Sequence, residues 1–302
     1  MPEGLNPEDL KKSGFIKQKQ PDLYSVRLRI PVGNLTSDQL CKIAEVSKEF
    51  GTGRVHITAR QSLEIRNIPL EKIDYLVKSL DEVDLQPGSC GPRVRNIVAC
   101  GGNRYCQHGL TDSEGLAYDM DKHFFGRELP RKIKIGVSGC PNSCSKPQEN
   151  DIGLVGKIRT NLNFELCAKY EDEEACGLCV EVCEQRAITI INGKPAIDYS
   201  KCQYDGICLQ TCPYDAWSGI PGYTVFMGGK IGKYPQLGYK IIDFIPEEER
   251  EFIFEIIERT IKFFGEESVK KERLGTFINR LGIQNFKREI LSGVELAQLE
   301  GF

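Results

Sequence analysis

The feature that most constrains this chain is the number and placement of its cysteines. Its 302 residues include 13 cysteines but only three histidines. Seven cysteines fall between residues 161 and 218, and two closely spaced pairs, Cys100/Cys106 and Cys140/Cys144, precede them. In a reducing compartment, clustered cysteines bind metals or catalyse more often than they form disulfides. Because zinc usually recruits histidine as well, these sets indicate iron–sulfur clusters.

Composition and charge exclude several classes of protein. Hydrophobic residues make up 40% and charged residues 27%, as in an ordinary globular chain of about two domains. The net charge of -3 argues against nucleic acid as the main partner. No apolar run reaches the ~18 residues of a membrane span, and the N-terminus lacks the basic start and apolar core of a signal peptide. We therefore expect a cytoplasmic protein.

Hydrophobic periodicity predicts a mixed α+β fold. Alternation over 24–30 predicts a strand, Thr36 opens a helix that runs to Phe50, and strands at 55–58 and 62–65 flank a tight turn. A helix over 69–80 completes a β-α-β-β-α order, which resembles a ferredoxin-like unit. Farther on we expect a strand at 133–137 and a helix over 246–264, ended by Gly265.

The first cysteine set has the spacing Cys100-x5-Cys106 and Cys140-x3-Cys144. Four thiolates suffice for one cubane cluster, although structural thiols spaced by chance are an alternative. The stretches 99–106 and 139–144 resemble the siroheme and 4Fe-4S signature of sulfite and nitrite reductases. The resemblance implies that all four cysteines hold a 4Fe-4S cluster and that Cys144 bridges it to the siroheme iron.

The second set lies in the cysteine-rich segment. Two stretches, 176–183 and 208–213, resemble halves of the bacterial two-cluster ferredoxin run, in which the fourth cysteine ligates the other cluster. One cluster would take Cys176, Cys179 and Cys212, and the other would take Cys202, Cys208 and Cys183. Each set is one ligand short of the standard run.

The two missing positions have different substitutes. Glu173 stands in place of one cysteine, and Cys167, six residues earlier, is the candidate replacement. Asp205 occupies the other position; its carboxylate can ligate iron, or the site can hold only three irons. A degenerate ferredoxin that has lost one cluster is the alternative interpretation. Cys41 and Cys90 fit neither set, and we expect both to be buried.

Basic motifs accompany the first cysteine set in the order of the same family. The turn 56–61 resembles its T-x-R-Q motif, 95–96 its R-N pair and 130–134 its P-R-K-x-K strand. The resemblance implies that four residues bind the substrate anion and supply protons: Arg60, Arg95, Lys132 and Lys134. A strand would place the two lysines on one face, where their repulsion would lower their pKa values. Solvated or salt-bridged surface cations are the alternative.

The same resemblance assigns residues to the cofactor. Glycines at 228–229 lie in a segment similar to the family's G-G-x-x-G stretch, where backbone N–H groups approach siroheme carboxylates. The candidate siroheme contacts are Cys144, Gln61, Asn96, Arg131, Asn142, Gly228, Gly229 and Lys230. The chain would thus bind siroheme, a coupled 4Fe-4S cluster, and one or two further 4Fe-4S or 3Fe-4S clusters.

The resemblance extends from about Tyr24 to Ile290 and is strongest to the C-subunit group of anaerobic sulfite reductases and to small dissimilatory-type reductases. It divides the chain into a ferredoxin-like half domain (1–80), a siroheme and 4Fe-4S domain (81–160), an inserted ferredoxin (161–218) and a return of the siroheme domain (219–302). The implied activity is six-electron reduction of sulfite to sulfide, with electrons entering through the insert. Nitrite reduction on the same frame and a non-catalytic siroheme electron carrier remain alternatives.

The resemblance also implies partners. Electrons require a donor protein or partner subunits. Larger family members build one site from two tandem repeats, whereas this chain has a single repeat. We therefore expect a two-fold homodimer, or pairing with a related subunit.

Overall fold

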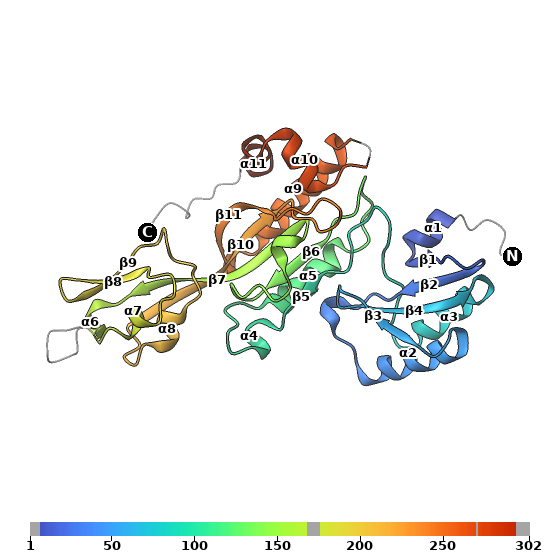
Figure 1. Cartoon of the computed structure of the whole chain (residues 1–302), viewed down its shortest axis with the longest axis horizontal. Helices are drawn as coiled ribbons and strands as arrows, with labels where there is room; N and C mark the ends of the chain where they lie inside the picture. Colours follow the sequence, from blue (N-terminus) through green and yellow to red (C-terminus); the bar gives the residue numbers. More distant parts are fainter. Residues whose placement is uncertain (1–6, 168–175, 270, 294–302) are drawn as a thin grey trace.

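The computed structural model describes residues 7–167, 176–269 and 271–293. Figure 1 shows three parts in a row: an N-terminal sheet with its helices, a central sheet, and the cysteine-rich segment at the opposite end. No helix in these described ranges is long and apolar enough to cross a membrane.

The N-terminal part is a four-stranded antiparallel sheet in the order β1-β2-β4-β3. Its strands are β1 (Phe15–Lys17), β2 (Leu23–Arg27), β3 (Val55–Ile57) and β4 (Leu63–Pro69), preceded by α1 (Pro7–Lys12). Helices α2 (Ser37–Phe50) and α3 (Ile73–Asp81) pack on it through buried side chains such as Val46 and Leu76. Thr36 begins α2 with a full capping box, as the sequence predicts.

The central part is a five-stranded sheet in the order β11-β10-β7-β6-β5. Its strands are β5 (Val98–Ala99), β6 (Ile135–Ser138), β7 (Ile152–Leu162), β10 (Trp217–Met227) and β11 (Tyr239–Pro246). β5, β6 and β7 run parallel, and β10 and β11 add antiparallel pairs. Because adjacent parallel strands end at the same edge, the loops after β5 and β6 lie side by side.

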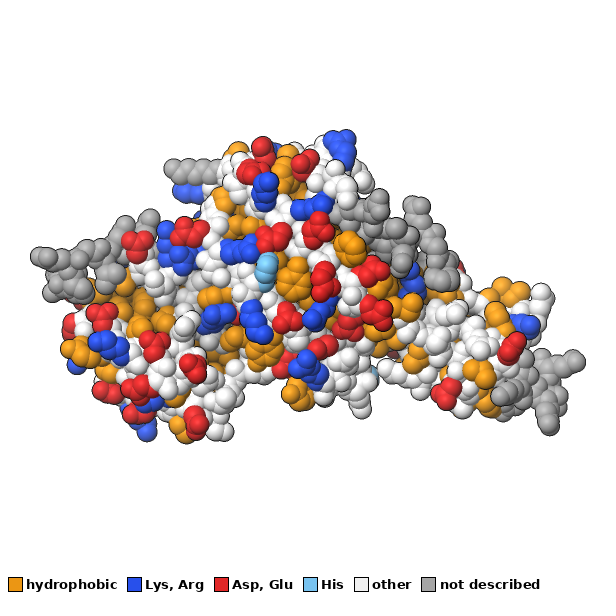
Figure 2. Space-filling model, turned by 180° about the vertical axis from the view of Figure 1, so that it is seen from behind, with side chains coloured by type: hydrophobic (Ala, Val, Ile, Leu, Met, Phe, Trp, Pro, Cys, Tyr) orange, Lys and Arg blue, Asp and Glu red, His pale blue; other side chains and the backbone are white. Residues whose placement is uncertain are grey.

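Helices cover this sheet and form its core. α5 (Ser113–Phe124), α9 (Glu251–Glu267), α10 (Leu274–Leu281) and α11 (Ile283–Leu291) bury residues such as Phe124, Phe264 and Phe277 in one cluster with the strands. Short helical turns η1 (Pro31–Gly33), η2 (Leu70–Lys72), α4 (Gly102–Tyr105), η3 (Pro147–Glu149) and η4 (Glu247–Glu249) occupy the connections. On the face shown in Figure 2, acidic and basic side chains are interspersed over the central part.

The cysteine-rich segment sits at the far end of the paired strands β7 and β10, which leave the central sheet together. It contains α6 (Phe164–Cys167), α7 (Leu178–Glu181), the hairpin β8 (Ile188–Ile191) with β9 (Lys194–Ile197), and α8 (Ile207–Thr211). Within its described residues, the buried core consists of Cys179, Ile188, Cys208 and Trp217. Two of these four side chains are thiols, so little apolar core is present.

Several predicted details are wrong. β2 ends at Arg27 rather than at residue 30. The helix expected from residue 246 begins at Glu251, because β11 extends to Pro246, and it continues through Gly265 to Glu267. A helical glycine costs about 1 kcal/mol, which burial of the neighbouring Phe264 offsets. Cys41 is exposed on α2, whereas Cys90 is buried as expected.

Candidate functional site

The loops after β5 and β6 bring the first cysteine set together. Cys100 follows β5 directly and Cys140 follows β6 by two residues. Burial raises the pKa of the Cys140 thiol, and the nearby thiols of Cys100, Cys144 and Cys106 raise it further. The Cys100 sulfur accepts the backbone N–H of Gly139 at 3.1 Å. The four thiols therefore share one electrostatic environment at the carboxyl edge of the parallel strands.

Close backbone packing holds these loops against each other. A Cβ atom added at Gly139 would lie 2.7 Å from the Cα of Gly102, and Gly102 itself has a φ of +54°. Among the described residues, no three His, Cys, Asp or Glu side chains are arranged to hold a single metal ion. Four thiols are the number of protein ligands that one cubane cluster takes.

The predicted cations gather at the opposite, amino edge of the same strands. Arg95 precedes β5, and Lys132 and Lys134 precede β6. Ile133 between the lysines is fully buried and forms an isolated bridge with Val94. The lysines therefore alternate with a buried residue as predicted, although no continuous strand forms there.

Both lysines have lowered pKa values. Burial is the main cause at Lys134, followed by the charges of Arg60, Lys132 and Arg273, and together they lower its pKa to about 8. Burial also lowers the pKa of Lys132, with Arg273 as the strongest neighbouring charge. The predicted direction is right, but its reason needs correction, since desolvation outweighs repulsion between the lysines.

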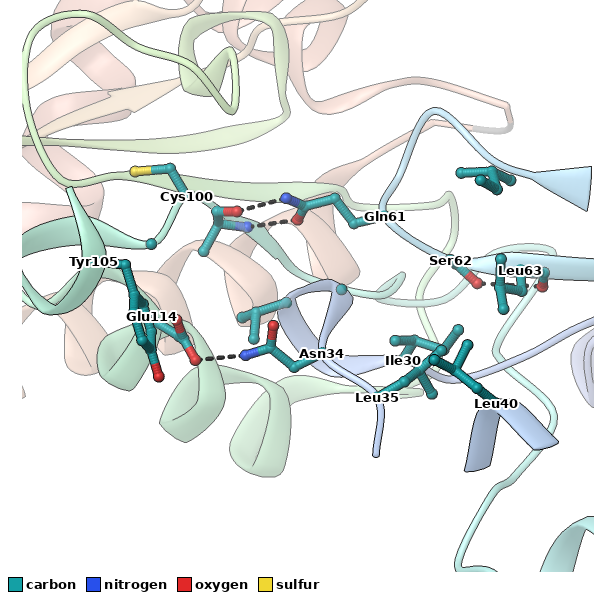
Figure 3. A pocket seen from close by; sticks show the side chains of 15 residues that line it. Ile30, Asn34, Leu35, Leu40, Gln61, Ser62, Leu63, Cys100, Tyr105 and Glu114 are labelled. Carbon is teal, nitrogen blue, oxygen red and sulfur yellow. Dashed lines mark hydrogen bonds between the residues drawn. The ribbon is translucent and has the colours of Figure 1, made fainter. Parts of the chain in front are cut away.

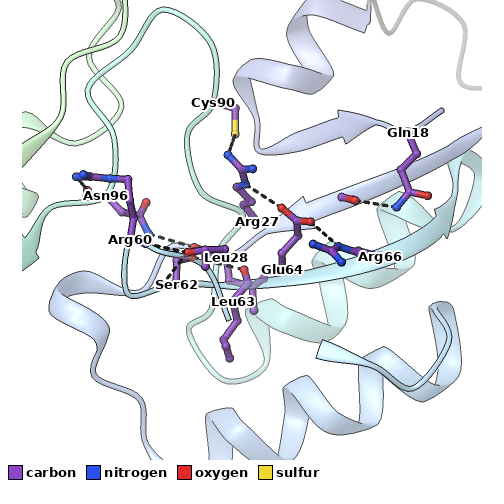
Figure 4. Close-up of polar contacts among 12 residues, drawn as sticks. Gln18, Arg27, Leu28, Arg60, Ser62, Leu63, Glu64, Arg66, Cys90 and Asn96 are labelled. Atoms are coloured by element: carbon purple, nitrogen blue, oxygen red, sulfur yellow. Dashed lines mark hydrogen bonds and ion pairs between the residues drawn. The ribbon is translucent and has the colours of Figure 1, made fainter. Parts of the chain in front are cut away.

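Arg60 reaches into the central sheet from the turn between β3 and β4. Its guanidinium donates to Asn150 Oδ1 (2.7 Å), to the Asn96 carbonyl (2.7 Å) and to the Ile135 carbonyl (3.1 Å). Burial lowers its pKa to about 10. Figure 4 shows this side chain beside Asn96 and Ser62.

Arg95 and Arg60 border one small cavity of about 190 Å³. Arg95 donates to the carbonyls of Ser89 (3.3 Å) and Gly91 (3.1 Å), and burial lowers its pKa. The Nε atoms of both arginines are buried and have no hydrogen-bond partner within the described part of the chain. Because an unpaired buried donor is costly, these groups fit a site that receives an anion.

Three polar residues of this region were missed by the sequence reasoning. Arg273, just before α10, donates to both carboxylate oxygens of Asp151 at 2.8 Å, and Asp151 is fully buried. Asp151 Oδ2 also accepts the backbone N–H of Lys134 at 2.9 Å. The adjacent Asn150 holds Arg60. The only sequence signal was this polar pair directly before the long apolar run of β7.

The candidate cofactor residues fall into two groups: some contact other parts of the chain, and the others are exposed. Gln61 pairs its side-chain amide with the backbone N–H (2.9 Å) and carbonyl (2.6 Å) of Ala99, and the Asn96 amide donates to the Leu28 carbonyl. A Cβ at Gly229 would lie 2.2 Å from the Gln148 carbonyl oxygen, Gly228 has a φ of +90°, and Lys230 bonds Thr276. These side chains and glycines have partners within the chain. The exposed candidates are Arg131, Asn142 and Cys144.

The cysteines of the cysteine-rich segment lie in two groups. The first group contains Cys167, Cys176, Cys179 and Cys212. Burial raises the pKa of Cys167, and the charges of Cys176 and Cys212 raise it further. Cys179 in turn interacts with Cys176 and Cys167. Glu173 lies outside the described residues.

The second group contains the carboxylate. Burial raises the pKa of Cys208 to about 11, and Cys202 and Asp205 contribute. Cys202 interacts in turn with Asp205 and Cys183. These four side chains border one small cavity. A second cavity, of about 250 Å³, lies between Asp205 and Cys140 of the first set.

A mixed α+β fold with clustered thiols and a separate group of partly buried cations agrees with an iron–sulfur oxidoreductase. Residues 90–297 match the nitrite and sulphite reductase 4Fe-4S domain, and residues 16–83 match the nitrite/sulfite reductase ferredoxin-like half domain. The chain belongs to the nitrite and sulphite reductase family.

Similar proteins cover most of the chain. The C-subunit of the anaerobic sulfite reductase of Salmonella typhimurium is 30% identical over 90% of this chain and 84% of its own length. The coenzyme F420-dependent sulfite reductase of Methanocaldococcus jannaschii is 32% identical over 92% of this chain, which spans 44% of that relative. A dissimilatory sulfite reductase I structure superposes with a TM-score of 0.72 at 22% identity, over 89% of this chain and 68% of that one. This last likeness concerns the fold.

Proposed function

We propose that the protein reduces sulfite to sulfide, a six-electron reaction. The observation that carries this proposal is the group of Arg60, Arg95, Lys132 and Lys134 at one edge of the central sheet, with two buried guanidinium Nε atoms that no described residue satisfies. A doubly charged oxyanion suits such a group. The sulfite reductases among the relatives support the same choice. Nitrite is the second candidate because the family's domain model covers both reductases.

The chain's own residues bind the anion and supply protons. Arginines stay charged at neutral pH and can fork to two oxygens, so Arg60 and Arg95 would anchor the substrate. Lys134, with a pKa of about 8, carries a proton at neutral pH and releases it more easily than an ordinary lysine. Asp151 fixes the backbone at Lys134 and so orients this donor.

The thiols at the carboxyl edge fit the iron–sulfur part of the cofactor. Cys100, Cys106, Cys140 and Cys144 would hold the 4Fe-4S cluster, and the exposed Cys144 would bridge to siroheme. Arg131 and Asn142, both exposed, would contact siroheme carboxylates. Siroheme would supply the redox-active iron that passes electrons to sulfite.

The insert would provide electron entry. Its first cluster would take Cys167, Cys176, Cys179 and Cys212, and its second Cys183, Cys202, Cys208 and Asp205. The shared electrostatic environment of each group supports these ligand sets. Asp205 of the second group and Cys140 of the first set border the same cavity of about 250 Å³, which supports electron passage between the two sets.

The two edges of the central sheet support a site built from two chains. Pairing of Ala99 with Val137 places the Cys100 loop about four residues beyond Lys134 along the strands, or ~13 Å at ~3.3 Å per residue. Cations and thiols of one chain thus lie at opposite edges. A two-fold homodimer would bring the cations of each chain to the thiols of the other.

The activity is tested on anaerobically purified, siroheme-loaded protein. With a reduced viologen as donor, we expect sulfide from sulfite at a higher kcat/KM than ammonia from nitrite. Lys132→Ala should lower turnover about 10- to 1000-fold, while Lys122→Ala, an exposed control, should leave it unchanged. A loaded protein that reduces neither anion, or an active Lys132→Ala, would overturn the proposal.

The paired site is tested by complementation. Lys132→Ala and Cys144→Ser chains, each with little or no activity alone, should regain part of the activity when mixed, because each mixed dimer holds one intact site. Sedimentation should show exchange of chains in the mixture. An active monomer, or no recovery in a fully exchanged mixture, would contradict the two-chain site.

A further inference from the structure

A cavity of about 760 Å³ lies at the carboxyl end of β5, beside Cys100 and Gln61, and most of its lining residues have no role in the proposed reaction. It opens between the N-terminal sheet and the central sheet, and Figure 3 shows Leu35, Leu40 and Leu63 on one side and Tyr105 on the other. Its rim exposes large apolar side chains: Leu40 is 51%, Ile57 76% and Tyr105 77% exposed. Such an exposed apolar surface indicates an interaction site.

The charge in this cavity decides which kind of occupant it fits. Among the described residues that line it, Glu114 is the only charged one, and neither lysine nor arginine is present. Glu114 is buried and accepts a hydrogen bond from Asn34, so its carboxylate is held in place. A cofactor with many carboxylates would meet a negative group and no described cation here. An apolar segment that carries positive charge fits better.

The loop between β10 and β11, residues 228–238, has this chemistry. Ile231 is 52%, Tyr234 73% and Leu237 65% exposed. Lys233 lies over the Tyr234 ring at 5.6 Å, which adds positive charge to the apolar tip. Reciprocal backbone hydrogen bonds between Lys230 and Gln236, both 2.9 Å, close the loop. It is therefore a preformed protrusion that is both apolar and basic.

The loop and the cavity lie at opposite edges of the central sheet. Met227, the last residue of β10, pairs with Ile152, the first residue of β7, so the loop leaves at the amino edge. The cavity adjoins Ala99 and Cys100 at the carboxyl edge. Within one chain the loop therefore cannot enter the cavity. In a two-fold dimer, the loop of each copy can enter the cavity of the other copy.

We propose that the β10–β11 loop of a second copy of this chain docks in the cavity at the end of β5, with Tyr234 and Leu237 against its apolar walls and Lys233 toward Glu114. The inference rests on the dimer of the proposed function and names the surfaces that form it. The same approach of amino edge to carboxyl edge brings the cations of one chain toward the thiols of its partner.

Photocrosslinking tests the contact directly. A photoreactive benzoylphenylalanine replaces Tyr234 in the cofactor-loaded protein, and equal amounts of ¹⁴N- and ¹⁵N-labelled chains are mixed, exchanged and illuminated. We expect mixed-isotope crosslinks from Tyr234 to residues 30–40, Ile57 and Tyr105. The same probe at Tyr75, which is 60% exposed on α3, is the control and should give no such crosslinks. Crosslinks mapped elsewhere, or only within one chain, would overturn the proposal.

Substitutions at the two surfaces test the energetics. Leu237→Glu and Ile57→Glu should each raise the dimer dissociation constant about tenfold or more in sedimentation, and Tyr75→Glu should not. Both side chains are exposed, so the variants should fold, and their siroheme absorbance should persist. A variant Ile57→Glu that stays dimeric but loses siroheme would assign the cavity to the cofactor instead. A wild-type protein that forms the crosslinks but reduces no anion would contradict the proposed function and leave this interface standing.

Discussion

The lowered pKa of Lys134 makes a testable prediction for the pH dependence of turnover. The drop from 10.5 to about 8 corresponds to about 3 kcal/mol in favour of the neutral amine, a figure that solvent at this partly exposed side chain reduces. The protonated fraction then falls from about nine-tenths at pH 7 to about one-tenth at pH 9. If Lys134 donates a proton in the rate-limiting step, kcat should fall about tenfold over that range.

The assay is steady-state sulfide production at saturating sulfite between pH 6.5 and 10. Lys134→Arg keeps the positive charge but gives up no proton, so it should turn over slowly and lose the decline near pH 8. Lys122→Arg, an exposed lysine, is the control and should keep the wild-type profile. A decline that stays in Lys134→Arg, or a wild-type kcat that holds up to pH 10, would refute the role assigned to Lys134.

The same lysine should affect the stability of the cofactor-free protein. Because its pKa is lower in the folded than in the unfolded chain, the unfolded chain binds more protons between about pH 8 and 10.5. The free energy of unfolding contributed by this group therefore rises with pH across that window. Lys134→Met should remove this rise, as measured by urea unfolding at pH 8 and pH 10. An identical pH dependence in both proteins would contradict the burial of the amine.

Three further changes test other parts of the site. Cys144→Ser should lose siroheme absorbance and turnover, since a serine oxygen is a poor bridging ligand; a variant that keeps both would contradict the bridging role. Asp205→Cys should raise the iron content of the purified protein if Asp205 leaves a three-iron or labile site, and an unchanged iron count would speak against such a site. Asp151→Asn should lower the free energy of unfolding by about 3–5 kcal/mol because it leaves Arg273 without its buried partner; a loss below about 1 kcal/mol in urea unfolding would show that the pair is not an important support.

The sequence predicts the elements that depend on interactions between residues close together in the chain. The capping residue Thr36 and the end at Gly51 predict α2, and the structure confirms its bounds. The cysteine spacings likewise indicate which thiols belong together. Cys100 and Cys106 are close in sequence, but only the parallel pairing of β5 with β6 brings them beside Cys140 and Cys144.

Features that depend on distant contacts were not predictable in this way. Arg273 and Asp151 are 122 residues apart, and the sequence around each residue does not indicate that the two side chains pair. The pKa of Lys134 is lowered by burial and by the charges of Arg60 and Arg273, which come from distant parts of the sequence. Gly265 does not end α9, which continues to Glu267, and the buried apolar face of the helix ends at Phe264, directly before the glycine.

The position of Trp217 gives the chain an internal optical probe. It is the only tryptophan in the sequence, and it lies at the start of β10 in the small core of the insert. Its indole interacts with the Cys179 sulfur, and it is only 5% exposed. Excitation at 295 nm would therefore report on this segment alone, and an assembled cluster at Cys179 would quench the emission by energy transfer. Fluorescence during iron loading could therefore follow changes in the cysteine-rich segment separately from the rest of the molecule.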